Sequence, residues 1–98
     1  MVELIETDDF RRWRRRLRDQ EAVFRINTRL ARLSAGLSGD VKPLGEGLSE
    51  LRIDYGPGYR VYFIRRGGQI IILLAGGDKR TQLADIKRAR SIAQAWQR

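Results

Sequence analysis

The sequence contains no cysteine and no histidine. Without cysteine the chain has no disulfide framework and no thiol nucleophile, and the cytoplasm is the expected location. Without histidine it lacks the commonest general base near neutral pH and a ligand of nearly every transition-metal site. Any chemistry therefore depends on Arg, Lys, Tyr, Asp or Glu, and we expect neither a metal nor another cofactor.

Long apolar stretches are also missing from the sequence. A bilayer crossing requires about 20 consecutive apolar residues, and the N-terminus lacks the basic segment and apolar core of a signal peptide. We therefore expect no contact with a membrane. Hydrophobic residues make up 42% of the 98 residues, which suits a folded core, and the length suits one domain over residues 1–98.

Positive charge dominates what is present. Twenty Lys and Arg residues oppose twelve Asp and Glu residues, for a net charge of +8, and seventeen of the twenty are Arg. Arginine binds phosphate through two parallel hydrogen bonds and stacks on bases. The balance favours a polyanionic partner such as nucleic acid or the ribosome. An acidic protein partner, or simply the base composition of the genome, would account for the same excess.

Three runs with the character of strands lie in the second half of the chain. They comprise residues 48–54, 59–64 and 69–75. In the first run apolar and charged side chains alternate, which places Leu51 and Ile53 on one face and Arg52 on the other. The last run is apolar throughout. Glycine-containing reversals join the runs, so we predict an antiparallel meander whose last strand is central and covered on both faces. A further glycine-containing turn is expected at 76–80.

Two helices are predicted before these strands and one after them. Their apolar positions recur at helical spacing, and they are Phe10, Trp13 and Leu17, then Val23, Ile26, Leu30 and Leu33, then Leu83, Ile86, Ala89, Ala93 and Trp96. Thr7 and Thr81 suit the N-cap positions of the first and last helices, and Gly36 suits the end of the second. Extended segments are expected at 2–6 and at 41–44.

The fold class that follows is α+β. We expect an antiparallel sheet with an N-terminal helical hairpin on one face and a C-terminal helix, in the order β-α-α-β-β-β-α. The helical hairpin and the sheet cover each other's apolar faces, so Trp13 and the helix leucines are expected in the core.

Six arginines crowd the first helix between residues 11 and 18. Such a run is either a solvated helix face or a surface that contacts a nucleic-acid backbone. We take Arg11, Arg12 and Arg15 as candidate RNA-binding residues.

A second basic group lies on the predicted strands. Arg52 and Arg60 occupy adjacent strands, and like charges opposite each other are costly unless an anion lies between them. This favours a phosphate site, although two arginines at the surface would satisfy the same pattern. Backbone N–H groups at the start of the last helix, beside Lys79 and Arg80, also favour an anion.

Several short segments together resemble a known family. They are Lys42-Pro43-Leu44, Leu48-Ser49-Glu50-Leu51-Arg52, Gly58-Tyr59-Arg60-Val61-Tyr62-Phe63, Leu74-Ala75-Gly76-Gly77-Asp78-Lys79-Arg80-Thr81-Gln82 and Asp85-Ile86. With the order of elements, they resemble the RelE/ParE superfamily of bacterial toxins. The match is nearest to its HigB-like, phage Gp49-related branch of addiction module killer proteins, and it covers nearly the whole chain.

The resemblance implies the toxin of a type II toxin–antitoxin pair, with a cognate antitoxin as partner. Ribosome-dependent members cut mRNA in the ribosomal A site, where a ribose 2′-oxygen attacks the adjacent phosphate. By position, Arg60 matches the strand arginine that stabilises the transition state, Arg80 the arginine after the last strand, and Arg52 a strand lysine. With Lys79 they would bind and activate the phosphate. We expect Arg60→Ala to abolish toxicity while the fold is kept.

The chain departs from the family pattern at the proton-transfer group. RelE-type enzymes have a tyrosine near the position of Ile86, HigB-type enzymes often use histidine, and a second strand lysine is replaced by Asp54. The remaining candidates for proton transfer are Glu50, Asp54 and Lys79. ParE-like members instead poison DNA gyrase without a nuclease site, so the alternative function is a non-enzymatic inhibitor of gyrase or another protein that binds its target through a basic surface.

Overall fold

Strands and helices follow one another along residues 1–96, the part of the chain that the computed structural model describes. The elements are β1 (Glu3–Glu6), α1 (Asp8–Arg16), α2 (Gln20–Ser34), β2 (Val41–Gly45), β3 (Leu48–Ile53), β4 (Tyr59–Arg66), β5 (Ile70–Asp78), the 3-10 turn η1 (Lys79–Thr81) and α3 (Gln82–Ala95). The predicted α+β class is confirmed, and the extended segment at 41–44 is strand β2.

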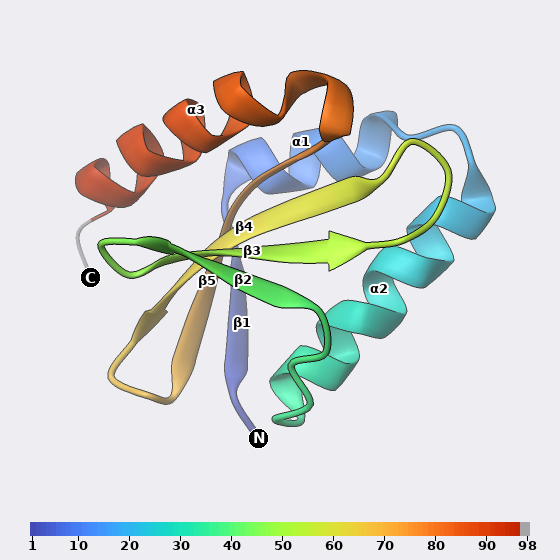
Figure 1. Ribbon diagram of the computed structural model, residues 1–98. Coiled ribbons are helices and arrows are strands. Elements are labelled where there is room, and N and C mark those ends of the chain that lie inside the picture. Colours follow the sequence, from blue (N-terminus) through green and yellow to red (C-terminus); the bar gives the residue numbers. More distant parts are fainter. Residues whose placement is uncertain (97–98) are drawn as a thin grey trace.

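The five strands form one sheet in the order β1-β5-β4-β3-β2 (Figure 1). The pairs β2–β3, β3–β4 and β4–β5 are antiparallel, as the meander predicted. The sheet is mixed rather than wholly antiparallel, because β1 pairs with β5 in parallel. Parallel neighbours need a long connection, and the helical hairpin and three strands between them supply it. β5 is therefore an interior strand, although β4 holds the middle of the sheet.

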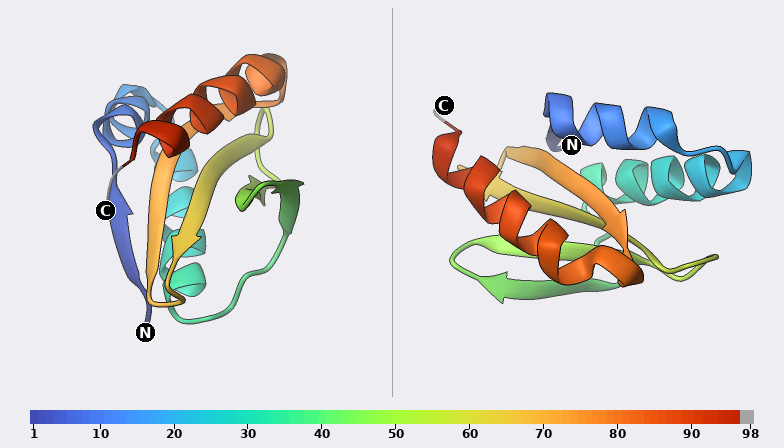
Figure 2. Two further views of the ribbon diagram at one scale, coloured as in Figure 1. Left: turned by 90° about the vertical axis from the view of Figure 1, so that its left-hand side faces the viewer. Right: turned by 90° about the horizontal axis from the view of Figure 1, so that it is seen from above.

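Helices cover both faces of the sheet. The two-helix unit of α1 and α2 lies on one side and α3 on the other (Figure 2). Along β5, Ile71 and Leu73 face α1 and α2, whereas Ile72 and Leu74 face α3. This alternation confirms that the apolar run is covered on both faces. None of the helices within residues 1–96 is long and apolar enough to cross a membrane.

Two of the three predicted helix ends are confirmed, at Thr7 and at Gly36. The Thr7 hydroxyl accepts a hydrogen bond from Phe10 N at 3.1 Å and so caps α1. Asp19 caps α2, since its carboxylate accepts from the backbone N–H groups of Glu21 and Ala22. Gly36, with φ +88°, ends α2 in the left-handed conformation that glycine adopts without strain. The connection between α1 and α2 is short, because α1 ends at Arg16 and α2 begins at Gln20.

The segment Gly76–Asp78 is the end of β5 and not the turn that its glycines predicted. The glycines serve close packing instead. A Cβ atom at Gly76 would lie 2.1 Å from the Trp13 ring, and one at Gly77 would lie 1.8 Å from Asp85 Oδ2. Because neither glycine has a side chain, α1 can lay Trp13 on one face of the strand and α3 can lay Asp85 on the other.

Leu83 lies where the helical pattern did not place it. It was predicted on the buried stripe of α3 and is 86% exposed, whereas Phe24, which lies off the apolar stripe of α2, is 64% exposed. The inward face of α3 begins with polar side chains, Gln82 and Asp85, so its apolar packing starts only at Ile86. Trp13 is half-buried against the core rather than fully enclosed.

We predict that Gly76→Ala lowers the free energy of unfolding by about 1–3 kcal/mol, because the new methyl group must displace the Trp13 ring. Urea unfolding of the wild-type protein and of Gly76→Ala measures this difference in free energy. In a Trp13→Ala background the same substitution should cost little, since the ring is gone. Equal costs in both backgrounds would show that Trp13 does not require the glycine.

Candidate functional site

An open groove lies where the turn between β3 and β4 meets the start of η1. Its volume is about 420 Å³, and it is lined by Asp40, Arg52, Asp54, Gly56, Pro57, Gly58, Arg60 and Lys79. Three of the four residues predicted to contact a phosphate therefore share one groove. The fourth, Arg80, is not among the lining residues.

The backbone brings these three cations together. Arg52 and Arg60 are direct cross-strand partners on β3 and β4. Lys79 joins them because its backbone N–H donates to Gly58 O at 3.1 Å, which ties the end of β5 to the β3–β4 turn. Gly58 itself has φ +83°, and a Cβ there would lie 3.2 Å from the Lys79 side chain and 3.5 Å from Arg60 Nη1. Glycine at this position permits both the turn and the close approach.

Arg52 is held at the rim of the groove by Asp40. Its Nη2 and Nε donate to Asp40 Oδ1 at 2.8 and 3.1 Å. The hydrogen bond with Asp40 raises the pKa of Arg52 above its usual value, so the guanidinium stays charged. The Arg52 backbone carbonyl accepts a further hydrogen bond from Arg29 Nη1 at 2.7 Å. The sequence offered no sign of Asp40, which comes from the loop before β2.

Arg60 lies deeper than an exposed strand position would suggest. The residue is 7% exposed, and its Nε is 3.8 Å from Oε2 of Glu50, which is completely buried. Gln82, the first residue of α3, donates to the same Glu50 oxygen at 2.7 Å. The prediction that Arg60 points away from the apolar core formed with α1 and α2 is confirmed. It points into a buried polar contact rather than into solvent.

The like charges of Arg52 and Arg60 do not need an external anion between them. Each has its own carboxylate, Asp40 for Arg52 and Glu50 for Arg60. The expectation that repulsion alone implies a phosphate is therefore weakened. The groove is a site of mixed charge, with Arg52, Arg60 and Lys79 opposed by Asp40 and Asp54 at its walls. Among the ion pairs found within residues 1–96, none involves Lys79.

Arg80 is engaged beside the groove by Asp78. Its Nη2 donates to Asp78 Oδ2 at 2.8 Å, and its backbone N–H donates to Oδ1 of the same carboxylate at 2.9 Å. These contacts with Arg80 lower the pKa of Asp78 below its usual range. The backbone N–H that was expected to receive an external anion is thus satisfied by Asp78. The Arg80 side chain nevertheless stays 78% exposed.

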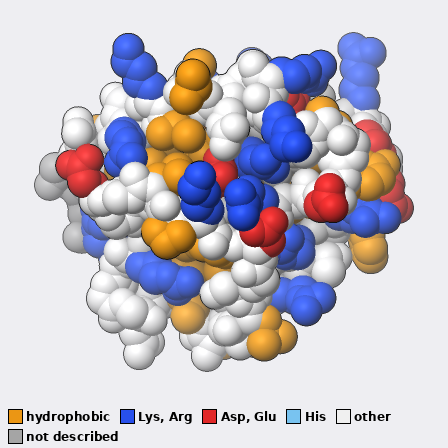
Figure 3. Space-filling view, in the orientation of Figure 1, with side chains coloured by type: hydrophobic (Ala, Val, Ile, Leu, Met, Phe, Trp, Pro, Cys, Tyr) orange, Lys and Arg blue, Asp and Glu red, His pale blue; other side chains and the backbone are white. Residues whose placement is uncertain are grey.

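The arginines of α1 belong to a different surface. Arg11 is paired with Asp8 and Arg12 with Asp9, whereas Arg15 is exposed. Of these three predicted RNA-binding residues, Arg12 lines a second cleft, which lies between α1 and α3. That cleft is lined by Asp9, Arg12, Trp13, Arg16 and Arg88, and it shares no lining residue with the groove. In the space-filling view, Lys and Arg side chains gather near the middle of one face, with acidic side chains between them (Figure 3).

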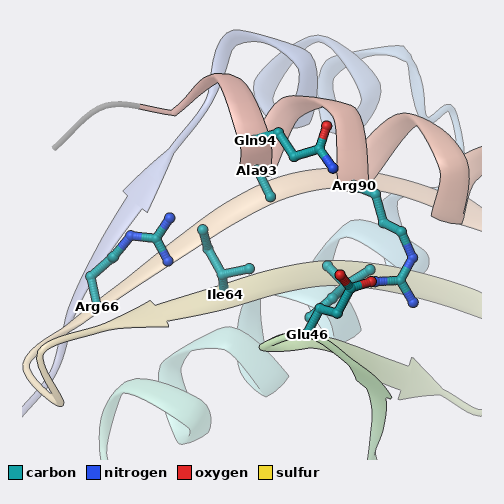
Figure 4. Close-up of a pocket in the computed structure, with 7 residues that line it drawn as sticks. Glu46, Ile64, Arg66, Arg90, Ala93 and Gln94 are labelled. Carbon is teal, nitrogen blue, oxygen red and sulfur yellow. The ribbon is translucent and has the colours of Figure 1, made fainter.

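A third cavity, at the far end of α3, holds two more arginines. It has a volume of about 170 Å³, and Figure 4 shows Arg66 and Arg90 on opposite sides of Ile64. Arg90 Nη2 donates to Leu44 O at 2.6 Å, and its Nη1 lies 3.5 Å from a Glu46 oxygen. These contacts tie α3 to the β2–β3 turn, and we interpret this cavity as structural.

The candidates for proton transfer separate by exposure. Glu50 is completely buried, whereas Asp54 and Lys79 are exposed and line the groove. Ile86, at the position where the family resemblance expects a tyrosine, packs into the core beneath α3. Tyr62, which faces Glu50 across β3 and β4, is also fully buried. Burial first, and the Glu50 carboxylate second, raise the pKa of Tyr62 well above its usual value.

Within residues 1–96 no group of three or more acidic side chains is placed to hold a metal ion. Pattern reasoning also missed the buried Asp85 and the half-buried Gln82 as inward-facing polar residues of α3. The apolar pattern is weak at the start of that helix, and this feature of the sequence could have indicated them. Thr81 sits at the N-cap position of α3, but its hydroxyl donates to Asp85 Oδ2 at 2.6 Å instead of capping the backbone.

We predict that Gly58→Ala disables the groove and that Gly47→Ala does not. The two glycines have nearly the same conformation, with φ +83° and +82°, so both substitutions carry the same backbone strain of about 1 kcal/mol. A Cβ at Gly47 meets nothing within 4 Å, whereas one at Gly58 pushes on Lys79 and Arg60. The midpoint temperature of thermal unfolding should fall similarly in both variants, and only Gly58→Ala should lose the toxicity that the family resemblance implies. Loss in both would show that strain alone is responsible.

The buried contact with Glu50 also changes the expected result for Arg60→Ala. Removing the guanidinium leaves a fully buried carboxylate unpaired, so we predict a loss of about 3–5 kcal/mol in the free energy of unfolding. The double variant Arg60→Ala/Glu50→Gln should recover most of it. Urea unfolding distinguishes the three proteins. If Arg60→Ala is as stable as the double variant, the buried carboxylate does not depend on Arg60.

Comparison with known proteins places the chain in a family. The family described as "Phage derived protein Gp49-like (DUF891)" matches residues 15–98. A protein of Haemophilus influenzae, described as an uncharacterized protein, is 45% identical over 93 residues, which cover 95% of this chain and 94% of that one. The residues that match the family include β3, β4, the turn between them and the 3-10 turn η1, which together build the groove. The chain belongs to the Gp49-like family of phage-derived proteins.

Proposed function

We propose that the protein is the toxin of a type II toxin–antitoxin pair and that it cuts ribosome-bound mRNA. The proposal combines membership of the Gp49-like family with the resemblance of its strand and turn segments to RelE/ParE toxins. The observation that carries it is the convergence of Arg52, Arg60 and Lys79 in one open groove.

Three cations around one open groove suit the chemistry of RNA cleavage. When a ribose 2′-oxygen attacks the adjacent phosphorus, the P–O2′ bond forms, the P–O5′ bond breaks, and negative charge builds on the phosphate oxygens. Fixed cations lower the energy of that charge in the transition state. Arg60, held beside Glu50, would bind the phosphate at the floor of the groove, with Arg52 and Lys79 at its sides.

Asp54 is the group we assign to the proton of the attacking 2′-hydroxyl. It is exposed, lines the groove and hydrogen-bonds to no described side chain. Glu50 is enclosed and has no path to a substrate. The leaving 5′-oxygen would then take its proton from Lys79 or from water. The ribosome would supply the strained mRNA geometry that this small groove does not impose by itself.

The remaining positive charge is suited to a large polyanionic partner. Arg12, Arg16 and Arg88 line the cleft between α1 and α3, which shares no lining residue with the groove. These arginines are suited to contact ribosomal RNA backbone. An acidic antitoxin would complement the same charge, and it is the partner we infer.

The test is primer extension on cellular mRNA after brief induction of the protein. We expect cuts within translated frames that disappear when translation is blocked. Lys79→Ala should reduce cleavage by about 10²-fold, because it removes one phosphate-binding cation. Lys87→Ala is the matched control, since Lys87 is an exposed lysine of α3 outside the groove.

Other results would contradict the proposal. Growth arrest with intact messages would favour a non-enzymatic target such as DNA gyrase, and supercoiling of plasmid DNA would then be measured directly. Intact messages with normal growth would exclude a toxin of either kind. Equal loss in Lys79→Ala and Lys87→Ala would remove the groove as the site.

A further inference from the structure

A cluster of three buried polar side chains lies beneath the groove. It contains Glu50 from β3 and Arg60 and Tyr62 from β4, and the half-buried Gln82 of α3 contacts it. Glu50 and Tyr62 are 0% exposed, and Arg60 is 7% exposed. Burying a carboxylate is costly even beside an opposite charge, and an apolar pair of similar volume often stabilises a fold as well or better. Stability alone therefore does not account for the cluster.

The hydrogen bonding within the cluster is incomplete. Glu50 Oε1, Arg60 Nε and the Tyr62 hydroxyl are all buried and have no hydrogen-bond partner within residues 1–96. Three unpartnered polar atoms at one place are unusual for a folded protein and call for an explanation. All three belong to residues that surround one ionic contact, the 3.8 Å approach of Arg60 Nε to Glu50 Oε2.

Glu50 has no route to a substrate, because no part of it is exposed. Its influence on the groove must therefore pass through Arg60, which lines the groove above it. Two of the three guanidinium nitrogens of Arg60 already lie against groups of the protein. Nε faces Glu50, and Nη1 donates weakly to Gly58 O and Tyr59 O, each at 3.4 Å. The remaining nitrogen, Nη2, has no hydrogen-bond partner among the described residues.

We propose that Glu50 is a positioning residue, which turns the Nε edge of Arg60 inward so that Nη2 is presented to a phosphate in the groove. Gln82 completes the arrangement, since its 2.7 Å hydrogen bond fixes Glu50 Oε2 from the first residue of α3. This inference rests on the proposed function for its role in cleavage, but the orientation of Arg60 does not.

The orientation is tested by nuclear magnetic resonance of the arginine Nε–H groups. The Arg60 signal is assigned by its loss in Arg60→Lys. In Glu50→Gln, which keeps the side-chain shape and removes the charge, we expect this signal to shift and to exchange faster with water. The Arg52 signal should stay in place. Glu21→Gln is the matched control, since it breaks an exposed ion pair with Arg25 on α2.

The consequence for cleavage is tested with ribosome-bound mRNA under single-turnover conditions. Glu50→Gln should lower the rate at saturation by about tenfold or more, because a misplaced guanidinium loses its alignment. The half-saturating concentration should change by less than about twofold. In an Arg60→Lys background Glu50→Gln should make no further difference, since its effect passes through Arg60.

Each outcome decides a separate point. If the wild-type protein does not cleave, the proposed function fails and the resonance measurement alone tests the positioning of Arg60. An unchanged Arg60 signal in folded Glu50→Gln overturns the inference, and so does an unchanged cleavage rate. If Glu50→Gln does not fold, Gln82→Met takes its place, because it removes the hydrogen bond to Glu50 by changing a half-exposed residue. It must then shift the same Arg60 signal, and a fixed signal would overturn the inference.

Discussion

The buried approach of Arg60 to Glu50 is the interaction on which the groove depends. It lies where β3, β4 and the start of α3 meet, so three elements must be in place before the guanidinium can be held. It also offsets the repulsion between two like charges, because Arg60 lies directly opposite Arg52 in the sheet. With Asp40 beside Arg52 and Glu50 beside Arg60, two like charges can be neighbours without mutual destabilisation. The two arginines of the groove are therefore held by the fold before any ligand arrives.

The glycines of β5 make this arrangement possible. Gly76 admits Trp13 from α1 and Gly77 admits Asp85 from α3, so one strand receives a helix on each face at the point where it leaves the sheet. That strand continues directly into Lys79, which is tied back to the β3–β4 turn at Gly58. The groove is thus built where β3, β4 and β5 come together, and side chains carried on strands are placed more precisely than side chains on loops.

Much of the fold could be predicted from the sequence, because periodicity reports burial directly. The apolar run of β5, the alternation in β3, and Thr7 as a cap all depend on short-range patterns. The predictions that failed concerned contacts between different elements of the fold. Gly76 and Gly77 were interpreted as a turn because their close packing against Trp13 of α1 and Asp85 of α3 arises only in the folded protein. Asp40 as the partner of Arg52 and the buried state of Glu50 likewise depend on elements brought together only by folding. Arg52 and Arg60 stood out in the sequence as like charges on neighbouring strands, whereas the carboxylates that hold them did not.

The central claim is that the groove directs cleavage of RNA at a phosphate. The most direct measurement is the chemistry of the new RNA ends when purified protein acts on a translating ribosome. Attack by the 2′-oxygen predicts upstream fragments that end in a 2′,3′-cyclic phosphate or the 3′-phosphate formed from it, and downstream fragments that begin with a 5′-hydroxyl. Free 3′-hydroxyl ends, or no new ends at all, would contradict the account.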